Sequence, residues 1–552
     1  MNNTVIKDGK DFVKNHGRLL LLSVVVAVLC YGFLVFSGNI RIDTEELINE
    51  PGTTLGWLKI GRYSLVLLKR LLGLGTHHIL WSALLFLLFF SAGGFFLAFL
   101  FYHASGKSED YPYWVFILLY GSSNVWCYQV YFSLQQAEMA LAMLLLAAAA
   151  LLAMRASFEV RGRGNILRYA VAALLAVIGF GAYQALVAYY ISICLGYFLI
   201  FLWRAQMPWQ ETYDGGRREE SRRLYGGIAR ILTHFVLSYG FYMAIAYRWF
   251  MSTGAYLTGQ KGWGRLSMIQ CVKNILRTIE RVVLCRGAEY FSFYTLGVLF
   301  SLLAVIWLLR RQWSGQKAKC VLFVLAWIAM LLTPFLMTVY MGEFIVIRAQ
   351  FALPVAAAFL GMYGIGVLRR VRPGTKGIWK TKSAGVFARL FPGIAGFLVL
   401  LTMVVQTAYC MQLSYTDDVR NEQDLAFAKE VAERLRLQCG DDYAKKTIIF
   451  VGRKIPALRR GCARTEMYGW SFFEWDYSPD NPTGATHRIL GYLRAAKIGN
   501  PDTDSFPEDA DEEQREEARR LAGQMSDFPS NGCIMETKDF IVVRLSAEEG
   551  AR

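Results

Sequence analysis

The stretch Leu19–Phe36 reads LLLLSVVVAVLCYGFLVF, an apolar run long enough to cross a bilayer as a helix. Basic residues precede it, as they do in a signal peptide, but no cleavage site of small residues follows. We therefore expect this stretch to be an uncleaved membrane anchor and the first of several spans.

The composition agrees with a membrane-embedded chain. Of 552 residues, 55% are hydrophobic and only 18% are charged, which is below the share typical of soluble domains. The formal net charge is +16, yet residues 412–552 carry more acidic than basic side chains. Because the basic residues cluster in short loops between apolar runs, the charge reflects membrane topology, and we expect no nucleic-acid partner.

Hydropathy predicts an α-helical polytopic core over residues 1–411 with about 11 transmembrane helices. The expected spans are Leu19–Phe36, Ile79–Tyr102, Tyr113–Tyr131, Ala137–Met154, Ile166–Ala182, Leu186–Trp203, Ile228–Phe250, Phe291–Leu309, Val321–Tyr340, Ala349–Leu368 and Phe387–Cys410. The third is the weakest, because Gly121-Ser122-Ser123-Asn124 interrupts it.

Basic loops set the expected orientation. Residues 155–168, 217–223, 310–319 and 369–382 are rich in Arg and Lys and fall between alternate pairs of spans. The positive-inside rule places such loops in the cytoplasm. We therefore expect a cytoplasmic N-terminus and, after an odd number of spans, an extracytoplasmic tail.

The tail, residues 412–552, is long enough to fold into a small domain. Lys446–Gly452 and Cys533–Leu545 have the pattern of strands, and Glu422–Leu437 that of an amphipathic helix. We expect an extracytoplasmic α/β domain.

An acidic sequence, Ile42-Asp43-Thr44-Glu45-Glu46-Leu47, lies just past the first span, in the expected outer loop 37–77. Carboxylates at the lip of a membrane core suit acid/base chemistry on lipid-linked substrates. Asp43 stands closest to the span, so we expect it to be the base, with Glu45 or Glu46 orienting an acceptor. The alternative is that all three merely solvate a loop.

Cations on the same side would stabilise a departing phosphate. Arg348 opens the tenth span, and its planar guanidinium fits a phosphate; the alternative is a structural pair with Glu343. Arg62 in the first outer loop is a second candidate. The outer loop 251–290 contains an amphipathic helix that presents further candidates for phosphate binding, or merely charges at the interface, at Lys273, Arg277 and Arg281.

Other residues on the outer side are candidates for lining a substrate site. They are Trp57, Glu138, Tyr183, Gln184 and Glu343. A carboxylate such as Glu138 in an apolar helix is costly and often functional, but at a helix N-terminus it also suits the helix dipole. The ten cysteines show no zinc or redox spacing, and we expect neither a metal nor a cofactor.

Four motifs resemble the bacterial serotype-converting glucosyltransferase family, the glucosyltransferase domain II type. They are Arg41-Ile42-Asp43-Thr44-Glu45-Glu46, Gly56-Trp57-Leu58-Lys59-Ile60-Gly61-Arg62, Gly181-Ala182-Tyr183-Gln184 and Ile347-Arg348-Ala349-Gln350-Phe351-Ala352-Leu353-Pro354. The family often shows an Asp-Asp pair where this chain has Asp-Thr-Glu-Glu. The span layout matches across most of residues 15–410, and the tail is not covered.

The resemblance implies a GT-C type, inverting glycosyltransferase in the bacterial cytoplasmic membrane. Its donor would be a polyprenyl-phosphate sugar, usually glucose, and its acceptor a cell-surface glycan, with a donor synthase and a flippase as candidate partners. The competing class is a transporter or flippase of a lipid-linked glycan. Transporters usually show internal repeats and polar residues at the midplane, whereas here the polar residues gather at the outer lip.

Overall fold

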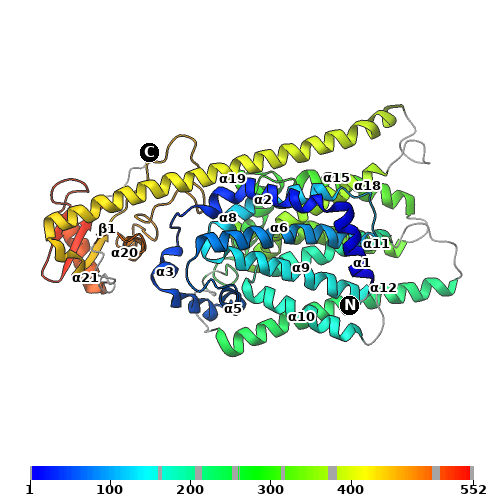
Figure 1. Ribbon diagram of the computed structural model, residues 1–552, viewed down its shortest axis with the longest axis horizontal. Helices are drawn as coiled ribbons and strands as arrows, with labels where there is room; N and C mark the ends of the chain where they lie inside the picture. The colour runs from blue at the N-terminus through cyan, green and yellow to red at the C-terminus, as the bar shows by residue number, and fades with distance from the viewer. Residues whose placement is uncertain are drawn as a thin grey trace.

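The computed structural model describes residues 3–158, 164–204, 214–251, 259, 261–312, 317–370, 382–499 and 510–546. Parts of three of the four basic loops, of the loop 251–290 and of the tail lie outside these residues, whereas residues 217–223, expected to be the remaining basic loop, belong to a helix. Within the described ranges, ten helices are long and apolar enough to cross a membrane. Figure 1 shows them packed into one bundle, with α1 (Asn3–His16) and a small sheet toward opposite ends.

The ten helices correspond to ten of the eleven expected spans. They are α2 (Arg18–Phe36), α6 (Ile79–Ala104), α9 (Gln136–Phe158), α10 (Gly164–Ala182), α11 (Leu186–Arg204), α12 (Asp214–Ile245, extended by a π-helical turn, Ala246–Phe250), α15 (Tyr294–Gln312), α16 (Lys317–Leu332, extended by the 3-10 turn Thr333–Phe335 and by α17, Leu336–Met341), α18 (Ala352–Arg369) and α19 (Lys382–Cys439). Phe33 of α2 and Phe397 of α19 are 72% and 64% exposed, as suits apolar side chains that face lipid.

The remaining expected span, Tyr113–Tyr131, is not one helix. It is divided into α7 (Tyr113–Gly121) and α8 (Asn124–Val130) at Ser122 and Ser123, because Gly121 and the two serines disfavour a continuous helix. The hydroxyl of Tyr31 donates hydrogen bonds to the carbonyls of Gly121 and Ser123, at 2.7 and 2.9 Å. A break at membrane depth is tolerated because its freed carbonyls find partners within the protein.

The α7–α8 segment nevertheless runs the length of the bundle. Near its start, the ring of Tyr113 lies 5.5 Å from that of His16 in α1. Just past its end, the ring of Tyr131 lies 4.8 Å from that of Tyr468 in the C-terminal part of the chain. The broken segment therefore adds a further passage to the ten helices and leaves α1 and Tyr468 at opposite ends of the bundle.

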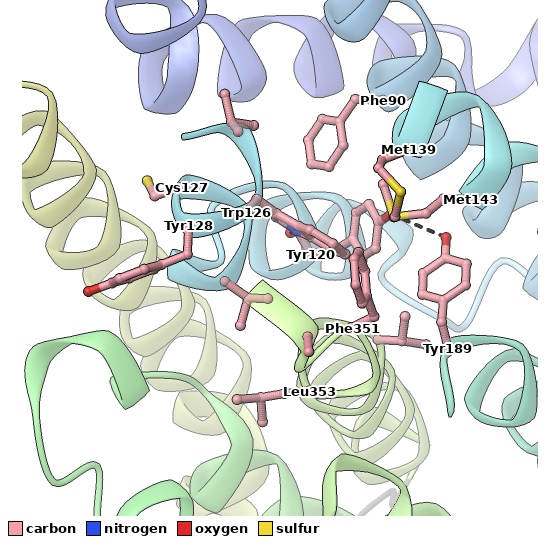
Figure 2. Packing of buried hydrophobic residues seen from close by; sticks show 14 of the residues in the cluster. Phe90, Tyr120, Trp126, Cys127, Tyr128, Met139, Met143, Tyr189, Phe351 and Leu353 are labelled. Carbon is pink, nitrogen blue, oxygen red and sulfur yellow. Dashed lines mark hydrogen bonds between the residues drawn. The ribbon is translucent and has the colours of Figure 1, made fainter. Parts of the chain in front are cut away.

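An aromatic core surrounds this broken segment (Figure 2). Phe90, Tyr120 and Trp126 contact one another with ring centroids 5.3 to 5.6 Å apart. The hydroxyl of Tyr120 is 3.2 Å from that of Tyr189 in α11. Trp126 also contacts Phe351, at 5.8 Å, which fixes the entry to α18.

The helix α19 differs from the expected elements. The sequence predicts a span ending at Cys410 and a separate helix at Glu422–Leu437, whereas the structure has one helix of 58 residues. No glycine or proline separates the two expected helices, so the backbone continues without a break. Figure 1 shows α19 extending along the bundle and beyond it to the sheet.

The C-terminal sheet has three strands in the order β1–β3–β2. β1 (Thr447–Val451) pairs in parallel with β3 (Phe540–Arg544), and β2 (Ile534–Glu536) pairs antiparallel with β3, close to the predicted strands. The helices α20 (Thr486–Ala495) and α21 (Glu512–Ala522) and the 3-10 turn Asp441–Lys445 complete this part of the chain.

Short helices occupy the end of the bundle nearest the sheet, where Figure 1 shows α3 and α5. The loop 37–77, expected to be the first outer loop, forms α3 (Thr44–Asn49), a 3-10 turn (Pro51–Leu55), α4 (Gly56–Lys59) and α5 (Tyr63–Leu71). Three further 3-10 turns, Ser133–Gln135, Ala288–Tyr290 and Ile347–Ala349, and the helix α14 (Met268–Val283) belong to other loops that the sequence predicts to be on the same side. The expected site residues lie on these elements or next to them.

Candidate active site

The three carboxylates of the acidic loop have three different environments. Asp43 caps α3 with a φ of 67°, a left-handed conformation that Asp adopts more readily than most residues, and its side chain is 41% exposed. The first turn of α3 directs Glu45 inward, so that its side chain is only 2% exposed, whereas that of Glu46 is 52% exposed. Glu45 is therefore the carboxylate shielded from water.

Arg488 of α20 joins all three carboxylates. Its Nη1 lies 2.7 Å from Glu45 Oε1 and 3.2 Å from Glu46 Oε1, and its Nη2 lies 3.1 Å from Asp43 Oδ1. Its Nε lies 2.9 Å from Oδ2 of a fourth carboxylate, Asp476. One guanidinium thus connects the C-terminal part of the chain to the loop that follows the first span.

Close packing of α20 against α3 makes this contact possible. A side chain at Gly491 would place its Cβ 3.2 Å from Cγ of Glu45, a tight contact that would require Glu45 to shift by a few tenths of an ångström. The side-chain amide of Asn49 donates a hydrogen bond of 2.9 Å to the Gly491 carbonyl.

The electrostatics of the cluster favour a base that works near neutral pH. Burial raises the pKa of Glu45 to about 7, although Arg488 opposes the shift. Burial also raises the pKa of Glu46, while hydrogen bonding to His487 and the nearby Arg488 hold the pKa of Asp476 at about 2. Oε2 of Glu45 is buried and has no hydrogen-bond partner. A buried carboxylate with one free oxygen is suited to accepting a proton.

A buried ion-pair network fixes the loop just before Asp43. Nε of Arg41 lies 2.8 Å from Oδ2 of Asp417 in α19, and Nη2 of Arg420 lies 2.7 Å from Oδ1 of the same carboxylate. Arg420 also reaches Asp424 at 3.2 Å and donates a hydrogen bond to the carbonyl of Ile40. The extension of α19 beyond the bundle thereby holds the acidic loop.

Arg348 is connected to this loop through Phe132 and Ser133. Its guanidinium stacks on the ring of Phe132, 3.9 Å from the centroid, and its Nε is buried without a hydrogen-bond partner. Phe132 precedes Ser133, whose Oγ is 3.4 Å from Oγ1 of Thr44 in the acidic loop. The Arg348–Phe132 stack is thus connected to the acidic loop through Ser133 and Thr44, and the unpartnered N–H of Arg348 has hydrogen-bonding capacity for an anion such as phosphate.

Arg62 and Tyr183 come together as a second cationic group. The Arg62 guanidinium is 4.3 Å from the centroid of the Tyr183 ring, and its Nε is also buried without a partner. Gln184 donates a hydrogen bond of 2.7 Å to the carbonyl of Ile60. The ring of Tyr183, which the Arg62 guanidinium faces, also contacts the ring of Phe351. Phe351 lies three residues after Arg348 in the sequence, so this contact joins the segment that carries Arg348 to the Arg62–Tyr183 pair.

Glu343 is placed differently from the alternative in which it pairs with Arg348. Oε2 of Glu343 lies 2.6 Å from Nη2 of Arg265, and its Oε1 accepts a hydrogen bond of 3.3 Å from Asn274 in α14. That alternative is wrong, because the turn at Gly342 directs Glu343 toward α14.

Glu138 is half of a buried ion pair with Lys69. Nζ of Lys69 lies 2.6 Å from Oε1 of Glu138, and the two side chains are 3% and 0% exposed. Trp57 lies beside Lys69, whose Nζ is 5.7 Å from the ring centroid. The sequence of α9 alone does not reveal this pairing with Lys69. Oε2 of Glu138 is buried without a hydrogen-bond partner.

The helix α14 has the composition of an interfacial helix. Its buried stripe consists of Cys271, Asn274, Thr278 and Val282. Ile269 and Leu276 are 70% and 58% exposed, although they are apolar, and the expected cations Lys273, Arg277 and Arg281 are also exposed. Arg281 stacks on Phe344, 4.9 Å from the ring centroid.

Sequence reasoning missed the residues that hold the site together. Asp417, Arg420 and Asp424 recur at helical spacing directly after the last span, a signal that was available. Arg488 and Asp476 lie in the tail, where no motif marks them. Among the residues described, no group of three or more His, Cys, Asp or Glu side chains is positioned to hold a metal ion.

Comparison with known proteins gives one match. A family model described as "Glucosyl transferase GtrII" matches residues 32–365, more than half of the chain. The matched range contains the acidic loop, Arg62 and Arg348 but not the extension of α19, Asp476 or Arg488. No curated protein and no solved structure matches the chain.

Proposed function

Because the chain belongs to the GtrII glucosyl transferase family, we propose that it moves glucose from a polyprenyl-phosphate donor to a cell-surface glycan. The reaction takes place at the outer face of the bacterial cytoplasmic membrane, in a GT-C type fold, with inversion at the anomeric carbon. A donor synthase and a flippase supply the lipid-linked sugar.

The observation that carries this proposal is the environment of Glu45. Its carboxylate is shielded from water, one oxygen is bound by Arg488 and the other is free. The sequence suggests Asp43 as the base because Asp43 is nearest the span, but Asp43 is 41% exposed. A base that must be partly desolvated is better supplied by Glu45, with Asp43 and Glu46 orienting the acceptor sugar.

The proposed step is a single displacement. Oε2 of Glu45 takes the proton from an acceptor hydroxyl as the hydroxyl oxygen forms a bond to the anomeric carbon. The bond between that carbon and the phosphate oxygen breaks, and its electron pair leaves with the polyprenyl phosphate. Attack opposite the leaving group inverts the anomeric centre.

Arg348 and Arg62 stabilise the departing phosphate. Each guanidinium is held against an aromatic ring and keeps a buried N–H without a partner, so each has hydrogen-bonding capacity for an anion. The exposed apolar and basic faces of α14 suit contact with lipid and with lipid phosphates, which would bring Lys273, Arg277 and Arg281 near the donor's chain.

Loop charge and the path of the chain support an outward-facing site. The broken segment α7–α8 and the ten helices make an odd number of passages, and the basic loops alternate with the loops that carry the acidic cluster and Arg348. By the positive-inside rule, the site lies outside.

Transfer in proteoliposomes tests the proposal. Purified protein is supplied with polyprenyl-phosphate [14C]glucose and an isolated cell-surface glycan, and radioactivity is counted in the glycan. The proposal predicts label in the glycan and release of polyprenyl phosphate. Movement of the labelled lipid across the bilayer without transfer would instead support a flippase.

A further inference from the structure

The contact between Arg488 and the acidic loop brings together two parts of the chain that are more than 440 residues apart. Each side-chain nitrogen of Arg488 is committed to a carboxylate: Nη1 to Glu45 and Glu46, Nη2 to Asp43, and Nε to Asp476. The Arg488 side chain is only 15% exposed. This is a specific arrangement, because a planar fork can bind several carboxylates only when they are placed around it.

We infer that Arg488 is a positioning residue for glycosyl transfer, supplied by the C-terminal part of the chain to orient Glu45 and keep it ionised. This inference rests on the proposed function, because it assigns Arg488 a role through the proposed base. It also gives the C-terminal sheet and its helices a part in the active site, although they lie beyond the residues that match the family.

The geometry explains how Arg488 would orient the base. By binding Oε1 of Glu45, the guanidinium fixes the rotation of the carboxylate and leaves Oε2 unpaired. Asp476 fixes the guanidinium in turn, through Nε. The near approach of α20 at Gly491 sets the distance between the two elements.

Charge explains how Arg488 would keep the base ionised. Asp43 and Glu46 on the same loop, and Asp476 across the interface, all disfavour a further negative charge at Glu45. His487, 3.3 Å from Asp476, is the other titratable group on α20 that faces this cluster. Arg488 therefore offsets both burial and the repulsion from the neighbouring carboxylates, and without it the pKa of Glu45 would rise above about 7.

Loss of Arg488 should move the acid limb of the pH–rate profile to higher pH. The reaction needs an ionised base, so its rate falls as pH is lowered through the pKa of Glu45. Removing Arg488 raises that pKa and moves the acid limb of the pH–rate profile to higher pH. Loss of an opposite charge at hydrogen-bond distance predicts a shift of about one to three pH units.

The test compares pH–rate profiles of the full-length protein in proteoliposomes, with polyprenyl-phosphate glucose as donor. Arg488→Gln should shift the acid limb to higher pH and lower kcat more than it changes KM for the donor. Arg488→Lys keeps the charge but not the fork, so its acid limb should stay close to that of the wild type while kcat remains reduced. Arg459→Gln is the matched control, because Arg459 is an exposed arginine of the same region that pairs with Glu422 at the surface.

Each outcome decides between a positioning role and a structural one. A uniform loss of activity in Arg488→Gln without a shift of the acid limb would overturn the inference, and so would a failure of Arg488→Lys to restore the wild-type limb. The same shift in a His487→Asn background would assign it to the carboxylate rather than to the imidazole. If the wild-type protein transfers no glucose, the proposed function fails. If Glu45→Gln is fully active, the assignment of the base fails, and the inference about Arg488 fails with it. If Glu45→Gln is inactive but Arg488→Gln keeps the wild-type profile, only the inference about Arg488 fails.

Discussion

Arg348 holds its guanidinium carbon 3.9 Å from the centroid of the Phe132 ring. Ser133, which follows Phe132, contacts Thr44, which lies between two of the candidate carboxylates. The segment Phe132–Ser133 therefore contacts both Arg348, the cation proposed for the leaving phosphate, and Thr44 in the loop that carries the proposed base.

Arg348→Lys should lower transfer activity strongly even though it preserves the charge. An ammonium neither stacks like a planar guanidinium on Phe132 nor presents a fork to a phosphate. Arg348→Ala should lower kcat by about a hundredfold or more, the loss typical of removing a group that stabilises transition-state charge. Initial rates with polyprenyl-phosphate glucose measure both variants. Arg459→Ala is the control, because Arg459 is exposed and pairs with Glu422 at the surface, and equal losses in Arg348→Ala and Arg459→Ala would contradict a specific role.

Asp417→Asn should destabilise the protein by about 3–5 kcal/mol, because it leaves Arg41 and Arg420 buried without their shared anion. The neighbouring Asp418 is exposed, and Asp418→Asn should be within about 0.5 kcal/mol of the wild type. Thermal unfolding in detergent compares the two substitutions. Equal melting temperatures for the two variants would show that the buried network does not hold the loop.

Substitutions of Lys69 and Glu138 test whether this buried pair stabilises the fold or takes part in the reaction. Glu138→Gln should lower the melting temperature, because it leaves the Lys69 ammonium buried without a charged partner. The double variant Lys69→Met/Glu138→Leu should recover stability, since apolar side chains of similar size often replace a buried pair at no cost. Transfer activity of the double variant close to wild type would assign the pair to structure. A stable but inactive double variant would return Glu138 to the substrate site.

Alkaline phosphatase fused after Gly440 should be active, because the odd number of passages and the basic loops predict that the end of α19 lies outside the cell. Gly440 is a better fusion point than a residue near the last span, because α19 continues to Cys439 without a break. A cytoplasmic reporter should be inactive at the same position. The opposite pattern would invert the topology and exclude an outward-facing site.

The sequence predicts the fold well where apolar runs are long and uninterrupted. Ten of the eleven expected spans are helices, and the strands of the tail lie within two residues of the predicted segments. The two exceptions have local causes. The third expected span is divided at its Gly-Ser-Ser sequence, and the break is tolerated because Tyr31 forms hydrogen bonds with the freed carbonyls. The helix α19 continues past the expected end of the last span because no glycine or proline follows there.

The site is less predictable because its contacts are distant in sequence. The acidic loop and Arg348 stand out by residue type and position. Periodicity does not reveal that Arg488 binds the loop, that Lys69 neutralises Glu138 or that Glu343 turns to Arg265, because each pairing depends on how separate helices pack. Burial also changes which carboxylate is the better candidate for the base. Asp43 is nearest the span in sequence, but the first turn of α3 shields Glu45 from water.

The most direct measurement is the rate of glucosyl transfer by Glu45→Gln beside that of Asp43→Asn, with protein level and melting temperature matched. Both changes preserve side-chain shape, and Asn tolerates the left-handed conformation of residue 43. Removal of the base predicts a loss of about a hundredfold to ten-thousandfold in kcat for Glu45→Gln and a smaller loss for Asp43→Asn. Wild-type kcat should itself fall as pH is lowered through about 7, the pKa of Glu45. Wild-type turnover in Glu45→Gln, with Asp43→Asn inactive, would move the base to Asp43; wild-type turnover in both would contradict the assignment of this cluster to catalysis.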